Sequence, residues 1–248
     1  MKINTYVNKT RRQLLRATVA TLAVSSLPLA LYAQTGASKM RIGIVGSGRV
    51  GSAVGGAWVK AGHEVMFSSL NLEEDKKLAA SLGGGAHAGT PREAAAFGTV
   101  LLMSVPYKAL PSVGKDLGDL LKGKIVIDAS NPIVARDGDM AVTARERGAG
   151  VASMEFLPGA RIVRAFNAVG AARMAEAHTR PVAERMGMPI AGDDEKAIAV
   201  ASALIRDVGY EPVLVGTHAG MSKHLIPGTP LAGERTPDEV RKVAATLK

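Results

Sequence analysis

The sequence predicts an α/β protein with a doubly wound, mostly parallel sheet and a small C-terminal α/β extension. From Met40 onward, short apolar runs alternate with longer amphipathic stretches, which is typical of strands joined by crossover helices. The first apolar run passes directly into a glycine-rich turn and a helical pattern. Without its first segment the chain has about 210 residues, which is enough to bury a substantial core.

Seven apolar runs predict the strands of this sheet. They span residues 40–46, 63–68, 99–105, 124–130, 160–167, 188–192 and 211–216. The stretches between them predict helices at 49–61, 73–82, 107–121, 194–207 and 236–247, with a shorter helix near 91–97. Glycines and aspartates interrupt the interval 133–159, which favours a loop-rich or irregularly helical segment. We expect a main domain over 40–165 and a smaller C-terminal α/β region over 166–248.

Residues 1–33 have the composition of an export signal. Basic residues precede an uncharged run that ends at Ala33, and no acidic residue occurs before or within that run. The pair Arg11-Arg12 resembles the twin-arginine signal, so we expect cleavage after Ala33 or Ala37 and a periplasmic or otherwise exported protein. The run is short and only moderately apolar compared with the ~20 residues of a spanning helix, so no permanent membrane anchor is expected. A disordered basic tail with a chance arginine pair is the alternative.

The composition argues against several other classes of function. Without residues 1–33 the formal charge falls from +9 to +4, and no concentrated basic stripe remains. Nucleic-acid binding is therefore not expected. The chain has no cysteine, which excludes disulfides, thiolate catalysis and cysteine-ligated metals. Asp193-Asp194 is typical of a helix start, so we expect no metal site there.

The turn after the first predicted strand fits the dinucleotide-binding pattern G-x-G-x-x-G. Its residues are Gly46, Ser47, Gly48, Arg49, Val50 and Gly51. The first glycine permits a tight turn, the second lets the backbone approach a pyrophosphate, and the third allows close packing of helix on strand. The N-terminus of the following helix would receive the anion. We therefore expect a Rossmann-type dinucleotide-binding domain over 40–165. Glycines that serve only a tight turn are the alternative.

The end of the second predicted strand bears on the choice between NAD and NADP. An NAD-binding domain usually carries an Asp or Glu there, whereas this chain has Ser68 and Ser69. Ser47, Ser69 and Arg49 can donate hydrogen bonds or charge to a 2′-phosphate, which favours NADP. The acids at 73–75 are interpreted as first-turn acids of the next helix. If one of them turned toward the ribose, the preference for NADP would weaken.

Several sequence blocks together resemble one known family, the NADPH-dependent reductases of the deazaflavin coenzyme F420. The blocks are "MRIGIVGSGRVG", "AGHEVMFSS", "AAAFGTVLLMSVPY", "GKIVIDASNP", "LPGARIVRAFNAV" and "PIAGDD". The resemblance implies direct hydride transfer between two cofactor rings that the protein orients. It also implies a homodimer, and a 2′-phosphate held by Ser47, Ser69 and an arginine. Leu70 stands in place of that arginine, and Arg49 is the first candidate to compensate.

Small or polar residues follow three of the predicted strands at their carboxyl ends. The residues that we expect beside the nicotinamide ring are Ser104, Val105, Pro106, Asn131 and Asn167. Ligands of open α/β sheets bind at this edge. As an alternative to ligand contact, Pro106 simply ends a strand and Asn131 caps a turn. Because direct hydride transfer between cofactors needs no protein acid or base, no catalytic side chain is predicted.

The sequence therefore predicts an NADP-dependent oxidoreductase with a deazaflavin-like (F420) or flavin acceptor. An NADPH-dependent reductase of small imine or carbonyl substrates is an alternative. It would need a proton donor, for which Tyr107, Lys223 and His224 are the candidates. A non-catalytic nucleotide-binding module is a third interpretation, and the missing arginine at Leu70 gives it mild support.

Overall fold

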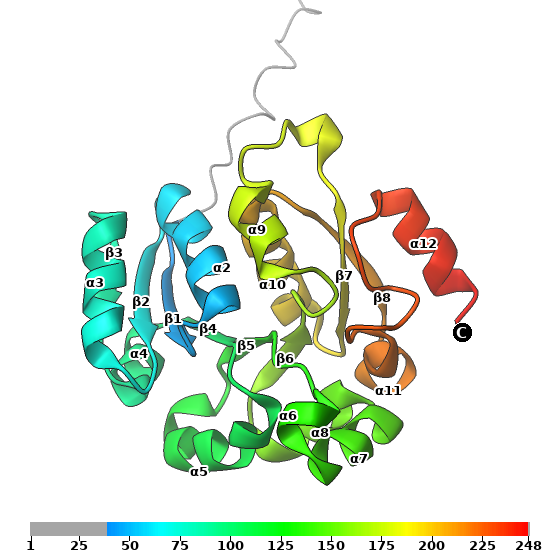
Figure 1. The fold of residues 1–248 in the computed structure, drawn as a ribbon, viewed down its shortest axis with the longest axis horizontal. Helices are drawn as coiled ribbons and strands as arrows, with labels where there is room; N and C mark the ends of the chain where they lie inside the picture. The colour runs from blue at the N-terminus through cyan, green and yellow to red at the C-terminus, as the bar shows by residue number, and fades with distance from the viewer. Residues whose placement is uncertain (1–38, 248) are drawn as a thin grey trace, which may run out of the picture. The chain divides into compact units, whose positions relative to one another are not determined.

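One sheet of eight strands organises the computed structural model, which describes residues 39–247 (Figure 1). The strands are β1 (Arg41–Val45), β2 (Glu64–Ser68), β3 (Ala86–Ala88), β4 (Val100–Met103), β5 (Ile125–Asp128), β6 (Arg161–Arg164), β7 (Gly187–Gly192) and β8 (Glu211–Gly216). Their order is β3-β2-β1-β4-β5-β6-β7-β8, and all neighbours are parallel except β6 and β7. The order reverses between β1 and β4, and open α/β sheets bind ligands at such a switch point.

Helices cover both faces of this sheet. They are α2 (Arg49–Lys60), α3 (Leu72–Leu82), α4 (Pro91–Phe97), α5 (Leu110–Leu121), α6 (Val134–Asp137), α7 (Asp139–Arg147), α8 (Ala149–Phe156), α9 (Ala171–Ala177), α10 (Glu195–Val208), α11 (His218–Met221) and α12 (Pro237–Ala245). One apolar cluster joins α2, α9 and α10 to one face, and a second joins α4, α5 and α8 to the other. The predicted doubly wound, Rossmann-type α/β fold is confirmed.

The apolar sequence of the central strands explains why helices pack on both faces of the sheet. Successive side chains of a strand point to opposite faces, so a strand covered on both sides must be apolar throughout. In β4, Leu102 lies in the cluster with α2 and α10, whereas Leu101 and Met103 lie in the cluster with α5. All three side chains are completely buried. Each such burial contributes about 1.5–3 kcal/mol to stability.

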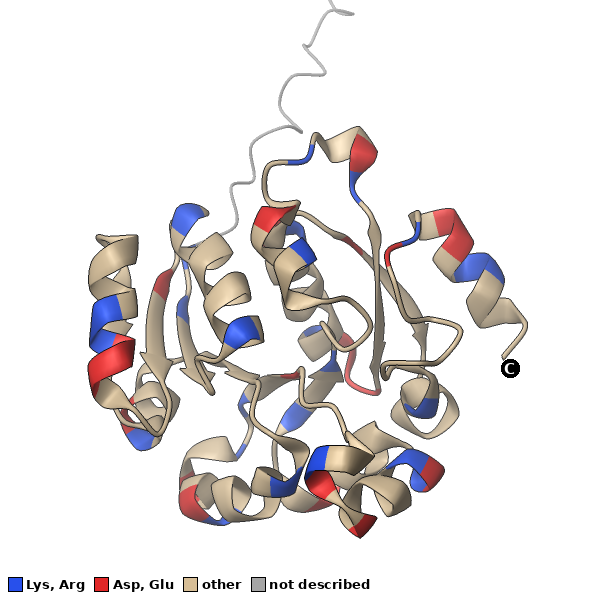
Figure 2. Cartoon of the chain, in the orientation of Figure 1, with Lys and Arg blue, Asp and Glu red and all other residues tan. Residues whose placement is uncertain are grey.

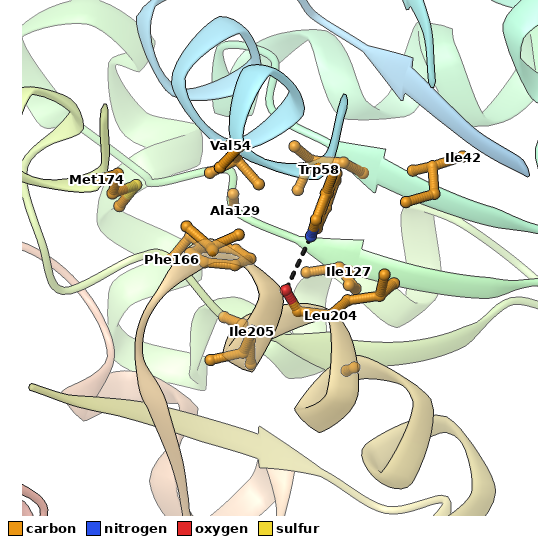
Figure 3. Packing of buried hydrophobic residues seen from close by; sticks show 14 of the residues in the cluster. Ile42, Val54, Trp58, Ile127, Ala129, Phe166, Met174, Leu204 and Ile205 are labelled. Carbon is orange, nitrogen blue, oxygen red and sulfur yellow. Dashed lines mark hydrogen bonds between the residues drawn. The ribbon is translucent and has the colours of Figure 1, made fainter. Parts of the chain in front are cut away.

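Trp58 joins α2 to α10 inside the first of these layers (Figure 3). The indole is completely buried, and its Nε1 donates a hydrogen bond of 2.8 Å to the carbonyl oxygen of Leu204. The ring also packs edge-on against Phe166, with the ring centroids 6.2 Å apart. Trp58 is thus a core residue, as the sequence indicates. Its packing holds α2, the helix that follows the glycine turn, in place.

The C-terminal extension is a second parallel unit in the same sheet. β7, α10 and β8 form it, and β7 pairs with β6 in the antiparallel direction. Both 40–165 and 166–248 therefore contribute strands to one sheet. Asp194 begins α10 as expected, because its carboxylate accepts a hydrogen bond of 2.9 Å from the N–H of Ala197.

Some elements differ from the sequence-based expectation. All seven predicted strands form, but β3 was not predicted, since it has three residues and directly follows three glycines. The interval 133–159 contains the short helices α6, α7 and α8, so the irregularly helical alternative is correct. The predicted export signal, residues 1–33, lies outside the described residues. Within 39–247, the structure contains no helix with the length and apolar character to cross a membrane.

Candidate functional site

The loop between β1 and α2 is shaped by hydrogen bonds to the end of β2. The N–H groups of Gly46 and Ser47 donate to the carbonyl oxygen of Ser68, at 2.9 and 3.0 Å. The hydroxyl of Ser68 is buried and donates to the carbonyl oxygen of Ile44 at 2.6 Å. Ser68 therefore holds the loop against the sheet, and a contact between its side chain and a nucleotide stays a prediction.

The three glycines of the loop have different tasks. Gly46 has a φ of 100°, which strains any residue with a side chain. A Cβ atom on Gly51 would lie 2.1 Å from the carbonyl oxygen of Gly46, so α2 packs here without room for a methyl group. A Cβ atom on Gly48 would meet no atom within 4 Å. Packing within the protein thus does not require glycine at 48, whereas close approach of a ligand does.

The N-terminus of α2 is open to an anion. Gly48 is the N-cap and makes no side-chain capping bond, and the first turn contains no acidic residue. The first N–H groups of a helix lack partners within it and carry partial positive charge. Arg49 adds an exposed guanidinium, and Val50 packs partly against the core. This end of the site fits the pyrophosphate of a dinucleotide.

The expected 2′-phosphate end of the site contains a carboxylate. Asp75 lies in the first turn of α3 and is only 1% exposed. It accepts hydrogen bonds from the hydroxyls of both Ser47 and Ser69, the second at 2.8 Å. One of the acids at 73–75 therefore does turn toward the loop. As arranged, these residues do not fit a 2′-phosphate, because a carboxylate and a phosphate in one place repel each other.

The neighbouring acids behave as the sequence indicates. Glu73 and Glu74 are exposed, and each pairs with the lysine three residues further on, at 2.8 and 2.9 Å. In Figure 2 the ribbon of α3 accordingly carries neighbouring acidic and basic segments. The sequence alone does not show at once which of the three consecutive acids, 73–75, faces the protein interior. Helical spacing is the signal that identifies it: Asp75 lies four residues before Ala79 and seven before Leu82, on the inward side of α3.

Two asparagines meet at the carboxyl ends of β5 and β6. Nδ2 of Asn131 donates to the carbonyl oxygen of Asn167 at 2.9 Å. Asn167 is buried, and its Oδ1 has no hydrogen-bond partner within the described residues. A buried oxygen without a partner is uncommon, and an amide of a ligand would satisfy it. Phe166, the residue before it, has a φ of 62°, a strained conformation of the kind that clusters at functional sites.

Residues 104–106 follow β4 at the same edge. The hydroxyl of Ser104 donates to the carbonyl oxygen of Gly46 at 2.5 Å, which ties this strand end to the glycine loop. Val105 is half-buried and Pro106 is exposed. The structure thus brings the glycine loop and the ends of β4, β5 and β6 to one edge of the sheet. Contacts of these residues with a nucleotide remain predictions.

A buried ionic network lies beneath this edge, and the sequence analysis did not identify it. Nη1 of Arg164 lies 2.7 Å from Oδ2 of Asp128, and both side chains are completely buried. Asp128 also accepts from the hydroxyl of Ser153 and from the N–H of Ser130. Nη2 of Arg164 donates to the carbonyl oxygens of Ser130 and Leu225. A charged residue at the carboxyl end of both β5 and β6, directly after apolar residues, is the signal that could have revealed it.

The candidate proton donors occupy different surroundings. Tyr107 is completely buried, its hydroxyl donates to the carbonyl oxygen of Ala149 at 2.6 Å, and burial raises its pKa to about 12. Lys223 and His224 precede Leu225, which contacts Arg164 at the carboxyl end of β6. Burial is the main cause that lowers the pKa of His224, and the charge of the neighbouring Lys223 lowers it further.

Within residues 39–247, no group of three or more His, Asp or Glu side chains is placed to hold a metal ion.

Solved structures of other proteins have a similar fold. A hypothetical protein from Sinorhizobium meliloti has a TM-score of 0.69 at 25% identity, over 84% of this chain and 98% of that one. An imine reductase from Myxococcus stipitatus has a TM-score of 0.56 at 19% identity, over 75% of this chain and 58% of that one. At such low identity the second similarity shows the fold alone.

Sequence similarity to known proteins includes the residues of the candidate site. The F420-dependent NADP reductase of Methanothermobacter thermautotrophicus is 28% identical over 187 residues, covering 68% of this chain and 77% of that protein. Residues 41–132 match the family described as NADP oxidoreductase, coenzyme F420-dependent. That segment contains the glycine loop, Asp75, and the ends of β4 and β5. Residues 41–132 of this chain are therefore similar to the coenzyme F420-dependent NADP oxidoreductase family, and the two comparisons together support an NADP-dependent oxidoreductase.

Proposed function

We propose that this chain transfers hydride between NADPH and a deazaflavin-like or flavin acceptor. The observation that carries the proposal is the open glycine loop, in which Gly48 leaves space before the uncapped N-terminus of α2. The loop lies at the switch point of the sheet and within the segment that matches an oxidoreductase family. The relative that is named an F420-dependent NADP reductase supports a deazaflavin as the acceptor.

The residues of the chain would bind and orient the dinucleotide. The first N–H groups of α2 would receive the pyrophosphate, and Asn131 and Asn167 lie at the edge where the nicotinamide is expected. Oδ1 of Asn167, which has no partner in the described part of the chain, can accept a hydrogen bond from a carboxamide. The bound nicotinamide supplies the hydride chemistry, while the protein holds the ring in position. Close approach of the two rings is then the main requirement for the rate.

An assay of NADPH oxidation tests the proposal. The full chain is mixed with NADPH and with F420, FMN or FAD in separate samples, and oxidation that requires one of these acceptors is expected. Gly48→Ala should raise the NADPH concentration that the reaction needs at least ~tenfold, because its methyl group fills the space before the loop. Gly84→Ala is the matched control, since its Cβ atom also meets no atom within 4 Å. NADPH binding without turnover on any acceptor would indicate the non-catalytic module instead.

Reduction of a small imine or carbonyl compound is the second candidate. One observation favours it: the contact between Arg164 and Leu225 brings the segment with Lys223 and His224 to the carboxyl end of β6. His224 with a lowered pKa could exchange a proton with a substrate nitrogen. NADPH-dependent reduction of a cyclic imine that is lost in His224→Gln would favour this candidate over transfer to a flavin-type ring.

We also propose that the protein is exported with its dinucleotide already bound. The twin-arginine-type pattern of residues 1–33 supports this, because that pathway exports folded proteins. The protein isolated from the periplasm is denatured, and the released nucleotide is identified by mass spectrometry. Stoichiometric NADP agrees with the proposal, and an empty protein speaks against it. Light scattering on the same sample tests the expected homodimer.

A further inference from the structure

Asp75 connects two parts of the dinucleotide site. Ser47 belongs to the glycine loop and Ser69 follows β2, and the hydroxyls of both donate to the carboxylate of Asp75. The side chain of Asp75 is only 1% exposed. A carboxylate that leaves water needs hydrogen-bond donors or a cation, because burial otherwise penalises its charge. Among residues 39–247, the two serine hydroxyls are the side-chain donors to this carboxylate.

The cations nearest in sequence do not neutralise Asp75. Lys76 and Lys77 form ion pairs with the two preceding glutamates and are mostly exposed. Leu70, at the position where the resemblance places an arginine, is fully exposed and uncharged. A negative charge thus stands at the place where a 2′-phosphate would need positive charge.

The two possible ribose substituents would meet this arrangement differently. A 2′-phosphate would face the carboxylate of Asp75 and compete with it for the hydroxyls of Ser47 and Ser69. A free 2′-hydroxyl can instead donate to the carboxylate, as it does to the acidic residue of NAD-binding domains. In those domains the acid stands at the end of the second strand, whereas here it would reach the same place from α3.

We propose that Asp75 determines specificity at the adenosine ribose and admits NADH to this site at least as well as NADPH. The inference rests on the proposed function, since it concerns the same dinucleotide site. It departs from what the family description implies, because Leu70 supplies no positive charge at this end of the site and Asp75 places a carboxylate there.

Binding titrations of the full chain test the inference. The dissociation constants of NADPH and NADH are measured by calorimetry for the wild type, for Asp75→Asn and for Glu74→Gln. Asparagine keeps an oxygen that can accept from the serines but removes the charge, so NADPH should bind ~tenfold more tightly while NADH changes little. Glu74→Gln removes the same charge one residue earlier, from an exposed side chain, and should alter neither constant appreciably.

A measurement on the wild type alone tests the specificity of the ribose site if Asp75→Asn does not fold. ADP-ribose and its 2′-phosphorylated form are titrated into the wild type, and ADP-ribose should bind at least as tightly. Tighter binding of the phosphorylated compound, or an equal effect of Asp75→Asn on NADPH and NADH, overturns the inference and leaves the proposed function intact. A wild type that binds neither dinucleotide overturns both.

Discussion

Asp128 and Arg164 are direct partners in the register of β5 and β6, and their side chains form an ion pair that is completely buried. The pair lies at the carboxyl ends of both strands, beneath the edge that carries Asn131 and Asn167. Arg164 also reaches the carbonyl oxygen of Leu225. The pair thus fixes two strand ends and a later segment relative to one another, which positions the floor of the site.

Removing one partner of the buried pair between Asp128 and Arg164 should strongly reduce the stability of the fold. Asp128→Asn leaves the guanidinium of Arg164 buried without a counter-charge, and we expect the free energy of unfolding to fall by about 3–5 kcal/mol. Urea unfolding followed by circular dichroism measures the change. Arg147→Gln, which breaks the exposed pair with Glu155, is the control and should leave the midpoint almost unchanged. Similar small effects of both substitutions would contradict a positioning role for the buried pair.

Alanine substitutions at two glycines of the loop should have different effects, one on stability and the other on NADPH binding. Gly51→Ala places a methyl group against the carbonyl oxygen of Gly46 and should reduce stability by about 1–3 kcal/mol. Gly48→Ala meets no protein atom, so its melting temperature should stay near that of the wild type while NADPH affinity falls at least ~tenfold. Thermal melts and NADPH titrations on both variants provide the comparison. An unchanged affinity in Gly48→Ala would show that no ligand approaches the loop.

Most of the fold could be predicted from the sequence because its signals are local. The run that forms β1 leads directly into Gly46, and the helical pattern of α2 begins two residues after Ser47, so strand, turn and helix follow from adjacent residues. β3 could not be predicted in the same way. Its three residues gain their strand conformation from pairing with β2, which is a tertiary contact.

The candidate site was less predictable, because its decisive contacts join distant residues. Ser47 and Asp75 are 28 residues apart in sequence, and only the packing of α3 beside β2 brings the carboxylate to the loop. Asp128 and Arg164 are 36 residues apart and meet through strand register. Residue types at strand ends indicate where a ligand binds, but the charge that it meets depends on such contacts.

Stability should depend on pH through the ion pair between Asp194 and Arg161. The hydrogen bonds from Arg161, and next that from the N–H of Ala197, hold the pKa of Asp194 well below its usual value. A depressed pKa in the folded state contributes stability above the pKa of the unfolded chain, and this contribution is lost as the pH falls toward the folded value. The stability difference between wild type and Asp194→Asn should therefore be largest near neutral pH and shrink below about pH 4.

Urea unfolding at a series of pH values measures that difference. Asp238→Asn is a suitable control, because Asp238 pairs with Arg241 on an exposed face of α12. A difference for Asp194→Asn that stays constant down to acidic pH would show that capping of α10, rather than the charge of Asp194, accounts for its contribution.

Tyr107→Phe should show whether Tyr107 is a proton donor or a structural residue. The hydroxyl of Tyr107 donates to the carbonyl oxygen of Ala149, and burial raises its pKa to about 12, so its proton is held within the packing of α8. We expect the variant to keep its rate of NADPH oxidation and to lose about 1 kcal/mol of stability, as for one buried hydrogen bond. Tyr210→Phe, which removes a buried hydroxyl bonded to Glu234, is the matched control. A ~hundredfold fall in kcat in folded Tyr107→Phe alone would identify Tyr107 as the proton donor of an imine or carbonyl reductase.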